Sequence, residues 1–280
     1  MMLQILRTHF ASLACAAACA CAATSDVPPP ARGVRLADLT WVEAEHVLLP
    51  ETVVVLPIGA EAKEHGPHLL LRNDHLLAEY FARRVLEAAD VVVAPTINYH
   101  FYPAFKEYPG STTLSLETAR DLVVEICVSL ARHGPRRFYA LNTGISTVRA
   151  LAPAAEELAK RGILLRYTDL KSLEPVEKEV CVQEAGSHAD ESETSVVLYI
   201  DPRAVDMSLA VKDCDTTKKG PLTRDPNGEG IYSPSGVWGD ATLATRAKGE
   251  RLCEALVGIL LADIESLRAA ELPPAPAPPP

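Results

Sequence analysis

Short apolar runs alternate with segments of helical periodicity along most of the chain. Runs rich in aliphatic, branched or aromatic residues predict strands at residues 52–57, 91–96, 137–141 and 163–167. Apolar residues at helical spacing predict helices at residues 74–88, 115–132, 146–161, 191–199 and 243–269. This alternation predicts an α/β fold of three layers, in which a mainly parallel sheet is covered by helices on both faces.

Two of these helices raise local questions. Ser115 is a good N-cap for the helix that follows it, but Thr118 three residues later is not the acid or amide of a full capping box. The segment 191–199 is less certain in type, because its branched residues at 196–200 would also suit a strand. The sequence leaves that segment open between helix and strand.

The N-terminus departs from the alternating pattern. Residues 1–7 carry one arginine, and residues 10–23 form a small-residue apolar run, shorter than the roughly 20 residues that a membrane-spanning helix needs. This is typical of a secretory signal peptide, and a core helix is disfavoured because the run has no polar face. We therefore predict a periplasmic or secreted protein without an integral membrane segment after cleavage. Lipid attachment at Cys15, Cys19 or Cys21 is an alternative.

The sequence predicts four segments along the chain. Residues 1–23 are predicted to be the signal peptide, 24–33 a linker and 34–271 one domain, since no repeat or linker interrupts them. Residues 272–280 are rich in proline and are predicted to be disordered. The net charge is −10 and the basic residues are scattered, which argues against nucleic acid as a partner. We expect a small molecule instead.

Polar clusters follow the predicted strands. They lie at residues 63–74, 100–110 and 142–147, and residues 186–195 add another. Because ligand sites of open parallel sheets lie beyond the carboxyl ends of the strands, these segments are expected to converge on one pocket.

The first and last of these clusters contain ligand-type side chains. His65, His68 and Asp74 suit a divalent ion such as zinc, manganese or iron. His188 and Glu193 add imidazole and carboxylate groups from a distant part of the chain. The alternative is a solvated loop whose histidines cap neighbouring helices.

Four ordered motifs resemble those of the creatininase (creatinine amidohydrolase) family. They are PIGAEAKEHGPHLLLRND at residues 57–74, YPGSTTLS at 108–115, HADESETS at 188–195 and GVWGDATLAT at 236–245. The resemblance implies an α/β fold, metal-dependent hydrolysis of cyclic or linear amide C–N bonds, and a homo-oligomer, commonly a hexamer. It also implies two metals bridged by one aspartate, which corresponds to Asp74, with His65 and Glu193 as further ligands.

Two departures from the family pattern fall on the same metal. Lys63 stands where the family has a glutamate, and Gly144 stands where the family has a histidine. We therefore predict one metal ion per chain, with the Lys63 ammonium occupying or neighbouring the place of the second ion. Alternatively, Glu64 takes over the ligand role and restores two metals, or the site binds metal weakly or not at all.

The remaining polar residues receive supporting roles. His188 and Asp190 are candidates for proton transfer to the leaving nitrogen. His68 is expected to orient a ligand.

Three further residues, His100, Tyr102 and Asn142, are candidates for contact with substrate or for support of the ligands. The predicted function is hydrolysis of a small amide by a metal-activated water. The alternative is a catalytically degenerate protein that keeps the pocket and binds a small ligand.

Overall fold

A five-stranded parallel sheet forms the centre of the computed structural model, which describes residues 31–274. The strands are β1 (Val34–Arg35), β2 (Val53–Ile58), β3 (Val92–Val93), β4 (Arg137–Asn142) and β5 (Leu164–Tyr167). Their spatial order is β1-β3-β2-β4-β5, and β2 pairs with β4 along its full length. The predicted signal peptide and the last residues of the predicted tail lie outside the described residues.

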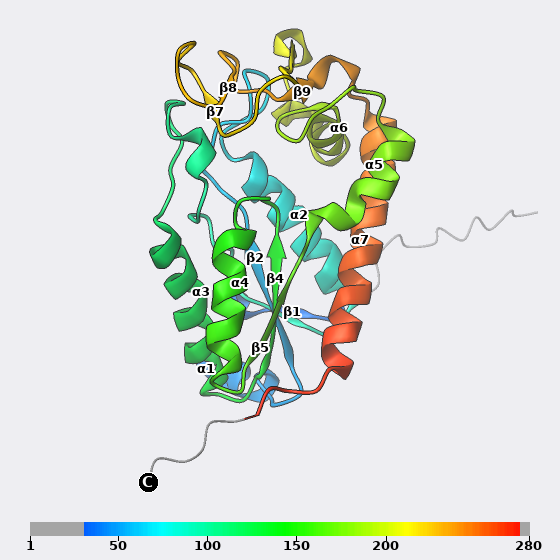
Figure 1. Cartoon of the computed structure of the whole chain (residues 1–280). Coiled ribbons are helices and arrows are strands. Elements are labelled where there is room, and N and C mark those ends of the chain that lie inside the picture. The colour runs from blue at the N-terminus through cyan, green and yellow to red at the C-terminus, as the bar shows by residue number, and fades with distance from the viewer. Residues whose placement is uncertain (1–30, 275–280) are drawn as a thin grey trace, which may run out of the picture. The chain divides into compact units, whose positions relative to one another are not determined.

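Helices cover both faces of the sheet. Alternate residues of β2 point to opposite faces, so each face has apolar side chains to bury. Val53 and Val55 pack in a core with α2 (Asn73–Ala88), α6 (Glu191–Ile200) and α7 (Arg246–Ala269). Val54 and Leu56 pack in a second core with α3 (Leu116–Ala131) and α4 (Val148–Ala159). Figure 1 shows α3 and α4 on one side of the strands and α7 on the other. The predicted three-layer α/β fold is confirmed.

The predicted elements agree with the observed ones to within a few residues at each end. Ser115 caps α3, accepting a hydrogen bond from the Thr118 N–H at 3.1 Å. The segment 191–199, which the sequence left undecided between helix and strand, is the helix α6. The strand predicted at residues 91–96 is shorter in the structure. Only β3 pairs regularly with β1 on one side and with β2 on the other. Three elements of this part of the chain were not predicted from the sequence: β1, α1 (Trp41–Val47) and α5 (Glu174–Val180).

The segment between α6 and α7 builds a cap of short elements. It contains β6 (Lys212–Asp213) paired with β9 (Gly239–Asp240), and β7 (Leu222–Thr223) paired with β8 (Ile231–Tyr232). Figure 1 shows β7, β8 and β9 beyond the carboxyl ends of β2 and β4. Short 3₁₀ helices complete the described chain, at Leu36–Asp38, Pro103–Phe105, Leu170–Leu173, Pro202–Ala204, Met207–Leu209 and Ala241–Leu243. Among the described residues, no helix is long and apolar enough to cross a membrane.

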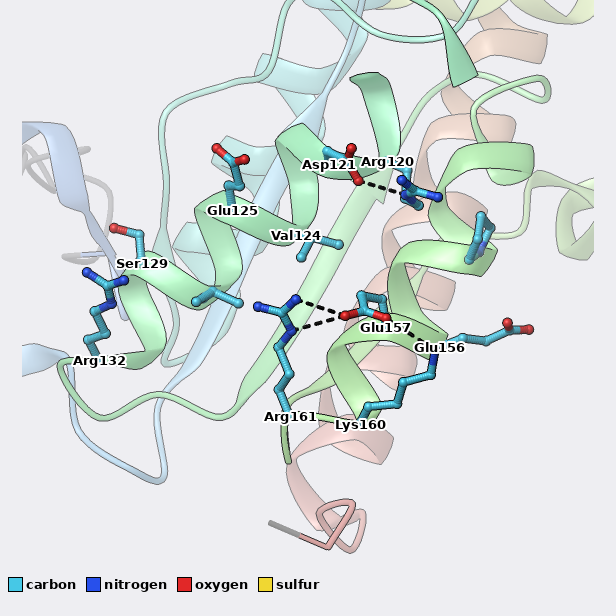
Figure 2. Close-up of a pocket in the computed structure, with 12 residues that line it drawn as sticks. Arg120, Asp121, Val124, Glu125, Ser129, Arg132, Glu156, Glu157, Lys160 and Arg161 are labelled. Carbon is cyan, nitrogen blue, oxygen red and sulfur yellow. Dashed lines mark hydrogen bonds and ion pairs between the residues drawn. The ribbon is translucent and has the colours of Figure 1, made fainter. Parts of the chain in front are cut away.

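A charged groove of about 760 Å³ lies between α3 and α4 (Figure 2). Its charges largely neutralise one another: Arg161 pairs with Glu157 at 2.8 Å, and Arg120 pairs with Asp121 at 2.7 Å. None of the residues singled out as candidate ligands lines it. The candidate chemistry therefore lies elsewhere, at the carboxyl edge of the sheet.

Candidate functional site

The candidate site begins where the chain leaves β2. From β2 the chain continues to the neighbouring β3 on one side, whereas β4 continues to β5 on the other, which opens a crevice between β2 and β4. Gly59 follows β2, and a Cβ there would overlap the backbone oxygen of Asp74. A glycine at this position thus lets the N-terminus of α2 approach the end of the strand.

A cavity of about 920 Å³ occupies this edge of the sheet. Its wall includes four residues predicted for the site from the sequence, which are Lys63, His188, Asp190 and Glu193. Other parts of the wall come from the loop at residues 143–146, from Phe105, from the segment 170–187 and from the cap. The distant sequence clusters therefore do converge on one pocket.

Lys63 and Asp74 form a buried ion pair at the base of this site. The ammonium Nζ lies 2.7 Å from Asp74 Oδ2, and the two residues are 5% and 0% exposed. Nζ also lies 5.4 Å from the centroid of the Tyr102 ring and 4.9 Å from that of Phe105. Burial alone would raise the pKa of Asp74, but Lys63 and His65 hold it well below its usual range. The carboxylate therefore stays ionised, also favoured by its place in the first turn of α2.

The His65 ring is oriented by the backbone. Its Nδ1 lies 2.9 Å from the Lys63 carbonyl oxygen, which can only accept, so Nδ1 carries a hydrogen. The opposite nitrogen, Nε2, lies 2.8 Å from Asp74 Oδ1 and 3.4 Å from Glu193 Oε1. In a neutral ring, Nε2 would present a lone pair to two carboxylates. The arrangement therefore calls for a cation at Nε2, either a proton or a metal ion.

His188 faces the same place from the N-terminus of α6. Its Nε2 lies 3.0 Å from Glu64 Oε2, and its Nδ1 lies 3.8 Å from Glu193 Oε2. The His65 and His188 ring centroids are 5.1 Å apart. Glu64 also accepts a hydrogen bond from the Gly66 N–H. A carboxylate that bonds one ring nitrogen and leaves the other free is the usual support of a metal-binding histidine.

The ligand-type atoms of His65, His188 and Glu193 lie within 4.8 Å of one another. Glu193 is held by the Asn73 side-chain amide at 2.9 Å and by the Ala189 N–H at 2.7 Å. Burial raises the pKa of Glu193, but its interaction with His65, His188 and Lys63 outweighs this and lowers it. Two imidazoles and an ionised carboxylate form a donor set that fits zinc, manganese or iron.

A strained turn sets up this cluster. Ala189 has a φ of 48°, in the left-handed region that residues other than glycine seldom adopt. It lies between His188 and Asp190, directly before α6, and its N–H bonds Glu193. The turn thereby fixes the imidazole and the carboxylate relative to each other.

Other predicted residues lie around the cluster in different roles. Glu64 lies outside the three-residue cluster, as the partner of His188. Asp190 caps α6 by accepting from the Glu193 N–H at 3.0 Å, and it also accepts from Gln183 Nε2 at 2.6 Å. Burial raises the pKa of Asp190 to about 6. Nε2 of His68 lies 2.8 Å from Thr194 Oγ1, which ties the loop after β2 to α6.

Three further predicted residues, His100, Tyr102 and Asn142, lie outside the cavity lining and outside the metal cluster. His100 is fully buried, and burial lowers its pKa to about 4. Tyr102 is also buried and packs beside the Lys63 ammonium. Asn142 binds the N–H and the C=O of Gly144 at 3.1 and 2.7 Å, so it holds the loop after β4 in shape. These residues support the wall from behind.

Several residues of the site were not found from the sequence. Phe105 stacks on His188 with ring centroids 4.3 Å apart. Gln183 bonds Asp190, and its Oε1 accepts from the Asp240 N–H at 3.0 Å. A lone glutamine between motifs carries no sequence signal. Phe105 follows the predicted second strand in a segment that was recognised only as a polar cluster.

Comparison with known proteins shows the family of the chain. The model of a family described as creatininase, creatinine amidohydrolase, matches residues 37–264. The chain belongs to the creatininase family. It is 29% identical to the creatinine amidohydrolase of Pseudomonas putida over 246 residues, 81% of this chain and 94% of the relative. It is 30% identical to a mycofactocin precursor peptide peptidase of Mycolicibacterium smegmatis over 220 residues, 76% of this chain and 83% of the relative. It thus resembles family members named for different substrates.

Solved creatininase structures share the fold. A mutant creatininase of Zn-Zn type superposes with a TM-score of 0.72 and a manganese creatininase with 0.70, both at 26% identity. The matches cover 85% of this chain and 99% and 100% of the other two. The predicted family is confirmed, and metal ions are named in the similar structures.

Proposed function

We propose that this protein hydrolyses an amide C–N bond of a small cyclic or linear substrate, using one divalent metal ion and the Lys63 ammonium. Water is added across the bond, so that a hydroxyl joins the carbonyl carbon and the nitrogen leaves with a hydrogen. The observation that carries the proposal is the buried Lys63–Asp74 ion pair, 2.7 Å long, beside the cluster of His65, His188 and Glu193.

The metal is proposed to be held by His65, His188 and Glu193. The tautomer of His65 and the Glu64 partner of His188 support this, since His65 turns an unprotonated Nε2 toward Asp74 and Glu193, and His188 turns Nδ1 toward Glu193. A divalent ion polarises a substrate carbonyl and lowers the pKa of a water that it binds. His188 then acts as a ligand, and its predicted role in proton transfer passes to Asp190.

Lys63 is proposed to replace the second ion of the family. Its ammonium offsets the charge of Asp74 and lines the cavity. There it donates a hydrogen bond to the substrate oxygen as negative charge develops on it. Tyr102 and Phe105 shield the ammonium from water, which strengthens that interaction. Asp190 lies in the cavity wall with a pKa of about 6 and is placed to deliver a proton to the leaving nitrogen.

A hydrolysis screen tests the proposal. Chelator-treated protein is reloaded with zinc or manganese and assayed against lactams, creatinine, N-acyl amino acids and short peptides. Hydrolysis that depends on metal, and that falls more than about 100-fold in both Lys63→Met and Glu193→Gln, is expected. Lys160→Met and Glu157→Gln, which change exposed charges of the groove between α3 and α4, serve as matched controls.

Two outcomes would contradict this function. Hydrolysis at full rate after complete metal removal would exclude the metal-dependent route. Absence of hydrolysis in metal-loaded protein, with ligand binding retained, would favour a degenerate binding protein. That second function is supported by Lys63 and Gly144, which stand where the family has metal ligands.

A further inference from the structure

The cavity is large for a small ring substrate. Its volume of about 920 Å³ lies near the upper end of the roughly 300–1,000 Å³ typical of sites for drug-sized ligands. A five-membered ring at the metal cluster would leave most of this space unfilled. The volume therefore favours a substrate larger than a single small ring.

Unpaired positive charge lines the mouth of this cavity. Lys171 comes from the 3₁₀ helix after β5, and Lys218 and Lys219 come from the loop between β6 and β7. All three are exposed, and none makes an ion pair with any residue between 31 and 274. This concentration is unusual in a chain whose net charge is −10.

The acidic residues of the same wall are already engaged. Glu174 pairs with Lys178 at 3.2 Å, and Glu177 accepts a hydrogen bond from Ser192 Oγ at 2.9 Å. Asp190 caps α6, and Glu193 belongs to the metal cluster. The exposed charges of this wall that have no ion-pair partner among the described residues are therefore the three lysines.

Apolar side chains line the same cavity as the lysines. Phe105, Leu222, Trp238 and Ile145 line the cavity, and Ile145 is 57% exposed. An apolar surface of this kind next to free ammonium groups suits a ligand with an apolar body and an anionic end.

We propose that the natural substrate is an amide that carries a carboxylate away from the scissile bond, such as an N-acyl amino acid or a short peptide with a free C-terminus. Lys218 and Lys219, with Lys171, bind the carboxylate, and the apolar wall receives the body of the substrate. This inference rests on the proposed function for the reaction, but its charge preference can be measured by binding alone.

A matched ligand pair tests the charge preference. N-benzoylglycine carries the carboxylate, and N-benzoylglycinamide replaces it with a neutral amide of similar size. Titration calorimetry with metal-loaded protein at low ionic strength gives a Kd for each, or a KM where the compound is hydrolysed. We expect N-benzoylglycine to bind at least about tenfold more tightly, since exposed ion pairs contribute up to about fivefold each.

A metal ion could itself bind a carboxylate. Variants therefore distinguish carboxylate binding by the lysines from carboxylate binding by the metal. In Lys218→Gln/Lys219→Gln, the ratio of the two Kd values is expected to fall below about threefold, and 0.5 M salt should reduce it in the wild type. Lys160→Gln, in the groove between α3 and α4, is the control and should keep the tenfold ratio.

The outcomes distinguish this inference from the proposed function. A ratio near one in the wild type, or a ratio that the double variant does not change, would overturn the inference even if amides are hydrolysed. A tenfold ratio without hydrolysis of any amide would support the charge preference and count against the hydrolase.

Discussion

Lys63 Nζ lies 2.7 Å from Asp74 Oδ2, and both side chains are buried at the carboxyl edge of the sheet. The resemblance to the creatininase motifs sets Lys63 at the position of a glutamate, and we propose that this ammonium replaces an ion there. The positive charge of Lys63 balances the negative charge of the buried Asp74 carboxylate.

Removing either partner of this pair should destabilise the fold. Lys63→Met leaves a buried carboxylate without its cation, and Asp74→Asn leaves a buried ammonium without its anion, each costing about 3 kcal/mol. The double variant should cost clearly less than the sum of the two. Urea unfolding in the presence of a chelator gives the three free energies. Strictly additive losses would show that the two groups do not interact.

Restoring the family's residues should restore a second metal. Lys63→Glu removes the ammonium, and Gly144→His supplies an imidazole; a Cβ at Gly144 meets Thr147 at 3.3 Å and Tyr102 at 3.4 Å, so small shifts accommodate it. The double variant should be unstable without metal, because the introduced glutamate and Asp74 repel, and zinc should raise its melting temperature more than that of the wild type. The measured metal content should rise from one ion per chain to two. An unchanged count would mean that the place of Lys63 is not a lost metal site.

His100 should make the fold sensitive to moderate acid. Burial lowers its pKa to about 4, below the value near 6.5 in the unfolded chain, so between these pH values the unfolded state binds more protons. The His100 contribution is therefore complete above pH 6.5 and is lost as the pH falls toward 4, by about 3 kcal/mol. In His100→Phe, the unfolding free energy should change less over this range. Parallel pH profiles of the wild type and the variant would assign the acid sensitivity to other groups.

Two glycines of α7 should respond oppositely to alanine. A Cβ at Gly249 would overlap the backbone oxygen of Ser195 on α6, whereas a Cβ at Gly258 meets nothing within 4 Å. Gly249→Ala should therefore force α6 and α7 apart, lower the unfolding free energy by more than about 2 kcal/mol and weaken metal binding through Glu193. Gly258→Ala should raise it by up to about 1 kcal/mol, because alanine favours helix. Equal effects in thermal unfolding would contradict the close contact of the two helices.

The sequence predicted the main elements because their periodicities are strong. The run at β2 is apolar throughout and fully buried, so its pattern could be read directly. Short elements escaped: α1 has a capping box of Thr40 and Glu43 that could have revealed it, but no buried residue. The two-residue strands of the cap carry no periodic signal at all.

The sequence predicted which residues form the site better than it predicted how they are arranged. His65, Asp74, His188 and Glu193 do come together, as the motifs implied. Whether Lys63 or Glu64 faces the site could not be decided, since adjacent side chains of an extended chain point apart. The irregular loop lets both contribute, with Lys63 against Asp74 and Glu64 against His188. Such loop geometry depends on contacts with α6 and the cap, which lie more than 100 residues away in sequence.

The number of metal ions per chain tests the central claim most directly. Mass spectrometry of the purified protein, saturated with zinc or manganese and then freed of excess metal, should give one ion per chain, with loss of that ion in Glu193→Gln. The Lys160→Gln control should keep it. Two ions per chain in the wild type would contradict the assignment of Lys63 as the replacement of the second metal, and none would contradict the metal-dependent hydrolase.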